Sequence, residues 1–215
     1  MAMKNIKVVS FDVEGTLTTT DFSYAIWFEA IHEVYAEKYK ISLEEAKSIV
    51  INEFQKAENQ GVESNDIDYW FSKFDLGNSQ KIMFKYQSLV KQYPDVKEIL
   101  SSLYKEYKLT IASSTTKNAL GYLLKDIKPY FQKIFSSISD YQQLKTPEFY
   151  LKICQTMKLR PDQIAHIGDN WQYDYLAARE IGIHAFHLDR TGKTNKKESF
   201  TDLISIKTYL IEQSC

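Results

Sequence analysis

The residues of this chain best suited to chemistry are two carboxylates that follow a short apolar run. Residues 8–11 (VVSF) predict a buried strand, and Asp12 and Glu14 come directly after it. Gly15 follows, and glycine takes backbone angles closed to other residues, so the chain can turn sharply there. In an open parallel sheet such a turn borders the crevice in which ligands bind. The stretch also fits an acidic junction at the surface, in which Asp12 caps a turn.

Further polar residues follow the other predicted strands. Ser113 and Ser114 end the strand at 108–113, Lys145 lies in the loop after the strand at 133–137, and Asp169 and Asp174 follow the strand at 163–168. All would lie on the carboxyl edge of one sheet, where they could converge with the first two acids. Such a group suits a phosphate held with Mg²⁺, because Mg²⁺ prefers hard oxygen ligands and a lysine offsets phosphate charge.

Each of these side chains also has a structural explanation when it is taken alone. Ser113 and Ser114 could cap the next helix, and Asp169 and Asp174 could complement a helix dipole. A lone Lys145 is typical of a solvated side chain.

Alternating strands and helices in the second half of the chain are the elements that position these residues. A fifth strand is predicted at 183–188, and helices are predicted at 95–106, through Leu124, at 147–157, at 172–181 and at 203–211. Five strands separated by helices indicate an α/β fold with a doubly wound, mainly parallel sheet and right-handed crossovers.

Residues 19–89 have a different pattern, which is helical throughout. An amphipathic helix is predicted at 22–39, and a second begins at the capping box of Ser42 and Glu45, runs to about Asn59 and ends at Gly61. We therefore predict a catalytic core made of 1–18 and 90–215, with an inserted helical domain at 19–89. The aromatic residues of the insertion are expected in its own core, although Tyr24 and Trp27 could face the site.

Composition indicates an ordinary globular protein. The 215 residues are 44% hydrophobic and 26% charged, with a net charge of −1, which gives no electrostatic reason to expect nucleic acid or an anionic membrane as partner. No signal peptide or apolar run of about 20 residues is evident. Cys154 and Cys215 make no metal spacing and are expected to be reduced thiols in a cytoplasmic protein. The four histidines, at positions 32, 166, 184 and 187, are interpreted as structural.

Four segments together resemble the motifs of the haloacid dehalogenase superfamily. They are DVEGTL at 12–17, Ser113 after a strand, KTP at 145–147 and GDNWQYD at 168–174, in that family's order. The motif-bearing segments run from residue 6 to about 190, and the helical insertion resembles the family's C1 cap. The resemblance implies a Rossmann-like core and a hydrolase of the phosphatase type.

The resemblance also implies roles for the acids. Asp12 would attack phosphorus and form an aspartyl-phosphate, and Glu14 would act first as general acid for the leaving alkoxide and then as general base for water. Asp12, Asp169 and the backbone carbonyl of Glu14 would hold Mg²⁺. Burial beside a like-charged aspartate is expected to raise the pKa of Glu14.

The remaining motif residues would serve the phosphate. Ser113 and the amide of Ser114 would bind its oxygens, Lys145 would steady the nucleophile, and Asp174 would orient Lys145 or a metal-bound water. The family often has Lys-Pro-Asp-Pro where this chain has Lys-Thr-Pro, so Lys152 is kept as a second candidate for the lysine.

These implications favour a Mg²⁺-dependent phosphatase acting on a small phosphorylated metabolite. Most phosphatases of the superfamily have aspartate where this chain has Glu14, and glutamate keeps the chemistry one methylene further out. The alternatives are a metal-independent 2-haloacid dehalogenase, which typically has a bulky non-acid at that place, and a non-catalytic binding module of the same fold. The sequence specifies neither the substrate nor the oligomeric state.

Overall fold

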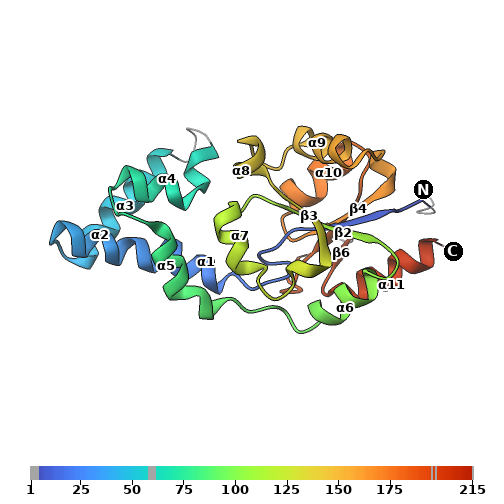
Figure 1. Cartoon of the computed structure of the whole chain (residues 1–215), viewed down its shortest axis with the longest axis horizontal. Helices are drawn as coiled ribbons and strands as arrows, with labels where there is room; N and C mark the ends of the chain where they lie inside the picture. Colours follow the sequence, from blue (N-terminus) through green and yellow to red (C-terminus); the bar gives the residue numbers. More distant parts are fainter. Residues whose placement is uncertain (1–4, 58–61, 195, 197, 215) are drawn as a thin grey trace.

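A six-stranded parallel sheet forms the centre of the fold (Figure 1). The computed structural model describes residues 5–57, 62–194, 196 and 198–214. The strands lie in the order β3-β2-β1-β4-β5-β6, and every neighbouring pair is parallel. Their bounds are Val8–Phe11 (β1), Lys108–Ser113 (β2), Phe131–Ser136 (β3), Ile164–Gly168 (β4), His184–Leu188 (β5) and Ser199–Phe200 (β6). The five predicted strands are present within two residues at each end, and β6 is a sixth that was not predicted.

The register of the sheet brings three strand ends together. Strand β1 lies between β2 and β4, and Phe11 pairs with Ile111 on one side and with Ile167 on the other. The residues that follow these positions therefore leave the sheet at the same edge, which is where the polar residues of the sequence motifs lie.

Helices cover both faces of the sheet because its buried residues alternate between two apolar clusters. Val9 and Phe11 belong to the cluster that contains α6 (Val96–Leu103) and α11 (Leu203–Ser214). Val8 belongs to the other cluster, with residues of α9 (Pro147–Met157) and α10 (Ala177–Glu180). Figure 1 shows these two helix pairs on opposite sides of the strands.

Two short helices complete this part of the chain, α7 (Lys117–Leu123) and α8 (Ser137–Tyr141), and α8 was not predicted. One predicted helix is irregular. The helix predicted at 172–181 begins as a wide, π-type turn over Trp171–Leu176 and becomes α-helical only in α10.

The insertion between β1 and α6 is helical, as the sequence pattern indicates. Its helices are α1 (Asp21–Ala25), α2 (Ile31–Tyr39), α3 (Leu43–Ala57), α4 (Ile67–Lys73) and α5 (Ser79–Tyr86), and a π-type turn at Ile26–Ala30 joins α1 to α2. The Ser42 hydroxyl accepts a hydrogen bond of 3.2 Å from the amide of Glu45, as expected for the start of α3. The predicted helix end at Gly61 lies outside the described residues. Figure 1 shows α2, α3 and α4 at the end of the molecule away from the sheet.

Two connecting segments join the insertion to the sheet, and they run side by side. The amide of Thr19 donates to the carbonyl of Lys91 at 2.9 Å, and the amide of Tyr93 donates to the carbonyl of Leu17 at 3.1 Å. Thr18 and Gln92 form an isolated antiparallel bridge between them. Within the described part of the chain, every helix is too short or too polar to cross a membrane.

Candidate active site

The turn after β1 places Asp12 at the edge of the sheet. The Asp12 amide donates to the carbonyl of Ile167 in β4 at 2.9 Å, and Asp12 as a whole residue is 5% exposed. Gly15 has a φ of +78°, and a Cβ at this position would lie 2.2 Å from Asp169 Oδ2. Glycine is therefore needed here both for its backbone angle and for the approach of Asp169.

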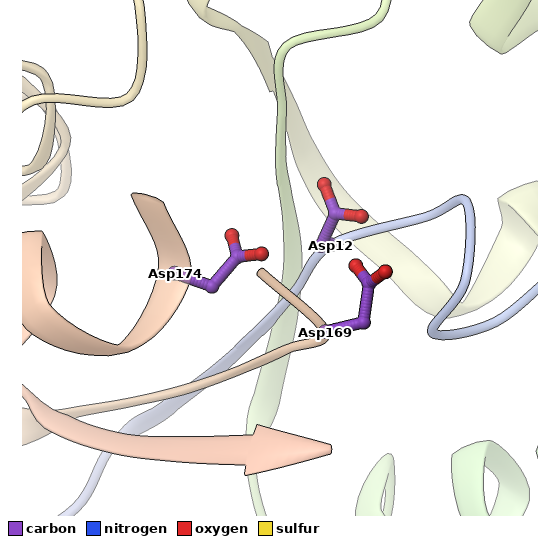
Figure 2. Close-up of side chains that lie close together, drawn as sticks. All are labelled: Asp12, Asp169 and Asp174. Carbon is purple, nitrogen blue, oxygen red and sulfur yellow. The ribbon is translucent and has the colours of Figure 1, made fainter. Parts of the chain in front are cut away.

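Three carboxylates meet at this edge. Asp12, Asp169 and Asp174 each offer an oxygen, and these oxygens lie within 4.8 Å of one another (Figure 2). They come from the end of β1, the end of β4 and the wide helical turn that follows. Close spacing of this kind concentrates negative charge, so the group requires cations nearby.

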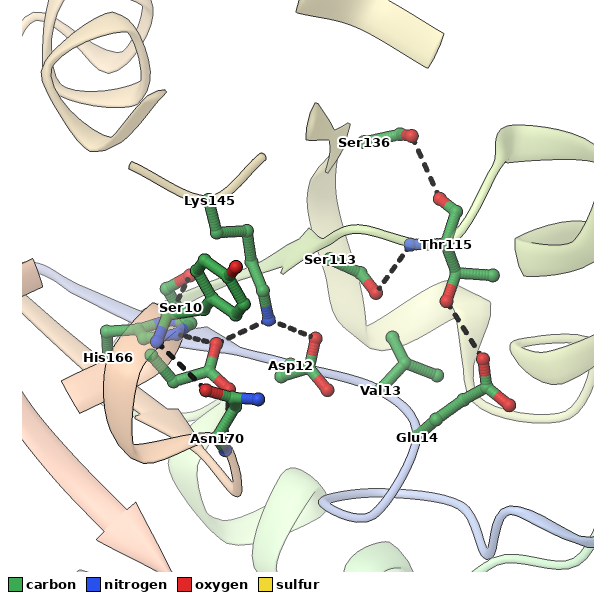
Figure 3. Close-up of polar contacts among 12 residues, drawn as sticks. Ser10, Asp12, Val13, Glu14, Ser113, Thr115, Ser136, Lys145, His166 and Asn170 are labelled. Carbon is green, nitrogen blue, oxygen red and sulfur yellow. Dashed lines mark hydrogen bonds and ion pairs between the residues drawn. The ribbon is translucent and has the colours of Figure 1, made fainter. Parts of the chain in front are cut away.

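Lys145 is the cation that the chain itself supplies. It is 4% exposed, and its Nζ donates to Asp12 Oδ1 at 2.7 Å and to Asp174 (Figure 3). Burial alone would lower the pKa of Lys145, but the charges of Asp12 and Asp174 outweigh it and raise that pKa. The ammonium therefore stays charged. Lys152, the second candidate, instead donates to Gln143 at 2.6 Å.

A buried network behind Asp174 fixes the carboxylate that holds Lys145. Asp174 accepts from the amide of Asn170 at 2.9 Å and lies 3.1 Å from His166 Nε2. His166 Nδ1 lies 3.2 Å from the Ser10 hydroxyl, and the Tyr150 hydroxyl lies 3.0 Å from His166 Nε2. Burial would raise the pKa of Asp174, but the Lys145 and His166 interactions lower it below the usual range of an aspartate.

Gly168 makes room for this arrangement. A Cβ on Gly168 would lie 2.2 Å from Asp174 Cγ, so no side chain fits at this position without moving the carboxylate. His166 and Tyr150 were not predicted as part of the site. Their contact depends on how α9 packs against β4, so no spacing in the sequence indicates it.

Asp169 faces the open side of the group. Loss of hydration in the folded protein raises the pKa of Asp169 to about 7, and the negative charges of Asp12 and Asp174 contribute to this rise. Its backbone carbonyl lies 2.9 Å from His187 Nε2, and His187 Nδ1 lies 2.6 Å from the hydroxyl of Ser199 in β6. The strand that was not predicted therefore helps to fix the backbone of Asp169. No described side chain donates a hydrogen bond to the Asp169 carboxylate or to Asp12 Oδ2, which leaves these oxygens for a cation.

Glu14 points away from the three aspartates. Its Oε2 accepts from the Thr115 hydroxyl at 2.9 Å (Figure 3), and its Oε1 accepts from the Ser23 hydroxyl of α1. Burial raises the pKa of Glu14, which is the expected direction, whereas these two hydrogen bonds oppose the rise. The sequence analysis did not identify Thr115 or Ser23, because a hydroxyl after a strand or in a first helical turn is common without any function.

All seven predicted site residues line one cavity. Its volume is ≈170 Å³, and its walls include Asp12, Glu14, Ser113, Ser114, Lys145, Asp169 and Asp174, together with Thr115, Asn170 and Tyr173. The Ser113 hydroxyl accepts from the amide of Thr115 at 3.2 Å, which shapes the loop after β2. The cavity has acids and a lysine on one side and hydroxyls on the other, a donor set suited to an anion held beside a divalent cation.

Comparisons with known proteins identify a family and similar folds. The family model of haloacid dehalogenase-like hydrolases (HAD) matches residues 6–182. A HAD phosphatase from Thermococcus onnurineus is 22% identical, with a TM-score of 0.84 over 95% of this chain and 98% of that one. A 2-haloacid dehalogenase from Pseudomonas syringae pv. Tomato is 19% identical, with a TM-score of 0.65 over 96% and 99% of the two chains. At these identities the structures show a shared fold. No curated protein matches the chain.

Proposed function

Because this chain belongs to the haloacid dehalogenase-like hydrolases, we propose that it is a Mg²⁺-dependent phosphatase of small phosphorylated metabolites. The observation that carries the proposal is the buried Lys145 held between Asp12 and Asp174, with Asp169 beside them. A divalent cation would offset the excess negative charge of this group and, together with Lys145, would allow an anionic phosphoryl group to bind beside it.

The donor set supports Mg²⁺ as the cation. Three carboxylates against one ammonium leave an excess of negative charge, and all the available ligand atoms are hard oxygens. Asp12 and Asp169 would hold the ion, together with the backbone carbonyl of Glu14. When bound, Mg²⁺ would offset charge on the phosphoryl oxygens.

Asp12 is the proposed nucleophile. Burial raises the pKa of Asp12 above its usual range, and the ion pair with Lys145 opposes that rise, so Lys145 favours the ionised form that attack requires. An oxygen of Asp12 would bond to phosphorus while the bond from phosphorus to the substrate oxygen breaks, giving an aspartyl-phosphate and a free alcohol. Ser113 and the amide of Ser114 would hold the phosphate oxygens, and Lys145 would stabilise the negative charge on these oxygens.

Glu14 is the proposed general acid and base. Burial raises its pKa, which favours the protonated form that a general acid for the departing alkoxide requires. Once ionised, the same carboxylate would take a proton from the water that cleaves the aspartyl-phosphate, and the enzyme would return to its starting state.

We further propose that residues 19–89 are a cap domain on a core formed by 1–18 and 90–215. The paired connecting segments at 17–19 and 91–93 support this division, because they are the two places where the chain passes between the insertion and the core. A cytoplasmic location, with Cys154 and Cys215 as reduced thiols, is part of the same proposal. In support, the buried Cys154 has a pKa raised to about 11, which keeps it a neutral thiol.

Release of inorganic phosphate from p-nitrophenyl phosphate, with Mg²⁺ or with EDTA, tests the function. We expect turnover only with Mg²⁺, none above background in Asp12→Asn, and normal turnover in the control Asp162→Asn, whose carboxylate pairs with Arg160 at the surface. Undiminished turnover in Asp12→Asn would contradict the proposal. Halide release from 2-chloropropionate in EDTA would instead indicate a dehalogenase, and no turnover of either substrate would favour a binding module.

A further inference from the structure

A second cavity of ≈170 Å³ lies between the insertion and the sheet, next to the acid-lined one. The two cavities share Glu14, Ser114 and Thr115 in their walls, so they adjoin at the proposed general acid. A phosphate in the first cavity would therefore place the rest of its ester in the second.

The walls of the second cavity are half apolar and half polar. Six of its twelve lining residues are hydrophobic, from the insertion and from α7: Phe22, Ile26, Trp27, Ile67, Met83 and Ala119. A cavity of about 150 Å³ with apolar walls is large enough for benzene. The volume here therefore fits one six-membered ring.

No positive charge lines this cavity among the residues that the structure describes. Glu14 is the only ionisable side chain among its described lining residues. A carboxylate or second phosphate on the leaving group would thus lose its hydration without gaining a counter-ion, and it would face a glutamate.

One polar group in the wall has no partner. Thr116 is 6% exposed, and its hydroxyl makes no hydrogen bond within the described part of the chain, although the residue stands at the N-cap of α7. Buried hydroxyls without partners are rare because each costs free energy, so a polar atom of a ligand is a natural partner.

From these observations we propose that the second cavity selects the leaving group, and that the substrates are phosphate esters of uncharged, ring-sized alcohols. The inference rests on the phosphatase function proposed above and deepens it. The apolar side chains of the wall hold the ring, the absence of a cation among its described residues rejects a second anionic group, and Thr116 offers one hydrogen bond to a polar substituent on the ring.

Benzyl phosphate and 4-carboxybenzyl phosphate test the proposal, because both esters release an alkoxide from the same CH₂ group and differ by one charge. We expect kcat/KM for benzyl phosphate to be at least ten times higher. Equal values, or a preference for the carboxylated ester, would overturn the inference while leaving the phosphatase function intact. Release of phosphate from neither ester, nor from p-nitrophenyl phosphate, would overturn both.

A charge placed in the wall gives an independent test. Ala119→Lys adds an ammonium to the cavity, and we expect it to reverse the preference between the two esters. Gly121→Lys adds the same charge to the same helix at a site with no atom within 4 Å of a Cβ, and it should leave the preference unchanged. Ala119→Met adds bulk without charge and should slow both esters alike. An unchanged preference in Ala119→Lys would count against the cavity as the selecting element.

Discussion

At the scale of single residues, the ion pairs of Lys145 are the feature on which the site depends. The buried carboxylates of Asp12 and Asp174 flank its ammonium, and Lys145 Nζ lies 2.7 Å from Asp12 Oδ1. Buried charges of this kind contribute little net stability as an intact group, but removing one partner leaves the others without compensation.

Replacement of Lys145 by methionine should therefore affect both stability and turnover. We expect Lys145→Met to lower the free energy of unfolding by about 3–5 kcal/mol, and to reduce kcat by about 10²–10³ through lost charge stabilisation. Urea unfolding and phosphate release measure the two effects. Lys152→Met is the matched control, since Lys152 contacts only Gln143 and the ring of Tyr141 in the described structure, and its kcat should stay within about twofold of wild type. Equal losses of kcat in Lys145→Met and Lys152→Met would contradict the assignment of Lys145 as the lysine of the site.

The pKa of Asp169 gives the metal-free protein a defined dependence on pH. Its carboxyl has a pKa of about 7 in the folded chain and 3.8 ordinarily, so the folded state holds this proton more tightly. The corresponding stability is present below pH 3.8 and is lost as pH rises through about 7.

We accordingly expect the Tm of the metal-free protein to fall between pH 5.5 and pH 8. Added Mg²⁺ should raise Tm more at pH 8 than at pH 5.5, because the ion and the proton compete for the same oxygens. Scanning calorimetry in EDTA and in Mg²⁺ measures both effects. Asp169→Asn removes the titrating group, and a pH slope as steep as that of wild type in this variant would assign the effect to other residues.

The site residues that could be predicted from the sequence are those that lie within a recognisable motif. Asp12 and Asp169 carry their own local pattern, because a strand and a glycine flank each of them. Thr115, Tyr150 and His166 carry none, and their contacts exist only because α9 and the loop after β2 pack over β4 and β1. Hydrogen bonds made through tertiary packing leave no spacing in the sequence from which they could be predicted.

At the scale of elements, the site is a property of strand ends and of the glycines beside them. Gly168 ends β4, and the space that its missing Cβ leaves is filled by Asp174 from the next turn. The strand could not carry a larger residue here without moving the carboxylate that holds Lys145.

Gly168→Ala should consequently destabilise the fold and impair turnover together. The added methyl group would lie 2.2 Å from Asp174 Cγ, and overpacking of a buried site costs about 1–3 kcal/mol. Gly121→Ala in α7 is the control, because nothing lies within 4 Å of its Cβ, and alanine there should stabilise the helix by about 0.5–1 kcal/mol. Urea unfolding compares the two variants, and opposite signs are expected. An unchanged free energy of unfolding in Gly168→Ala would mean that the Asp174 carboxylate can move aside without cost.

Elements with a strong apolar period were predicted well, and those without one were not. Strand β6 has only two residues and α8 only five, too few to establish a pattern, yet Ser199 of β6 contacts His187 beside the site. The wide turn at Trp171–Leu176 has a helical pattern in sequence, and that pattern did not indicate its π-type geometry or the place of Asp174 in the buried network.

At the scale of the whole molecule, the proposed function requires the insertion to close over the core. Beyond the connecting segments, α4 and α7 meet through a hydrogen bond from Asn118 Nδ2 to Asp68 Oδ2 at 2.7 Å. Phe22 and Tyr122 pack nearby with ring centroids 6.1 Å apart. These contacts hold the insertion over the second cavity, whose walls come from both sides.

Loss of the Asn118 contact should shift the molecule away from the closed arrangement. A hydrogen bond of this kind contributes about 1 kcal/mol, which corresponds to about a fivefold change in the ratio of closed to open molecules. We expect Asn118→Ala to raise KM for benzyl phosphate by up to about that factor with a smaller change in kcat, since the bound ester restores closure. Asp75→Ala is the control, because Asp75 pairs only with Lys38 inside the insertion in the described structure, and its KM should match wild type. An unchanged KM in Asn118→Ala would show that the connecting segments alone hold the insertion in place, because the ester would then bind as well without the contact between α4 and α7.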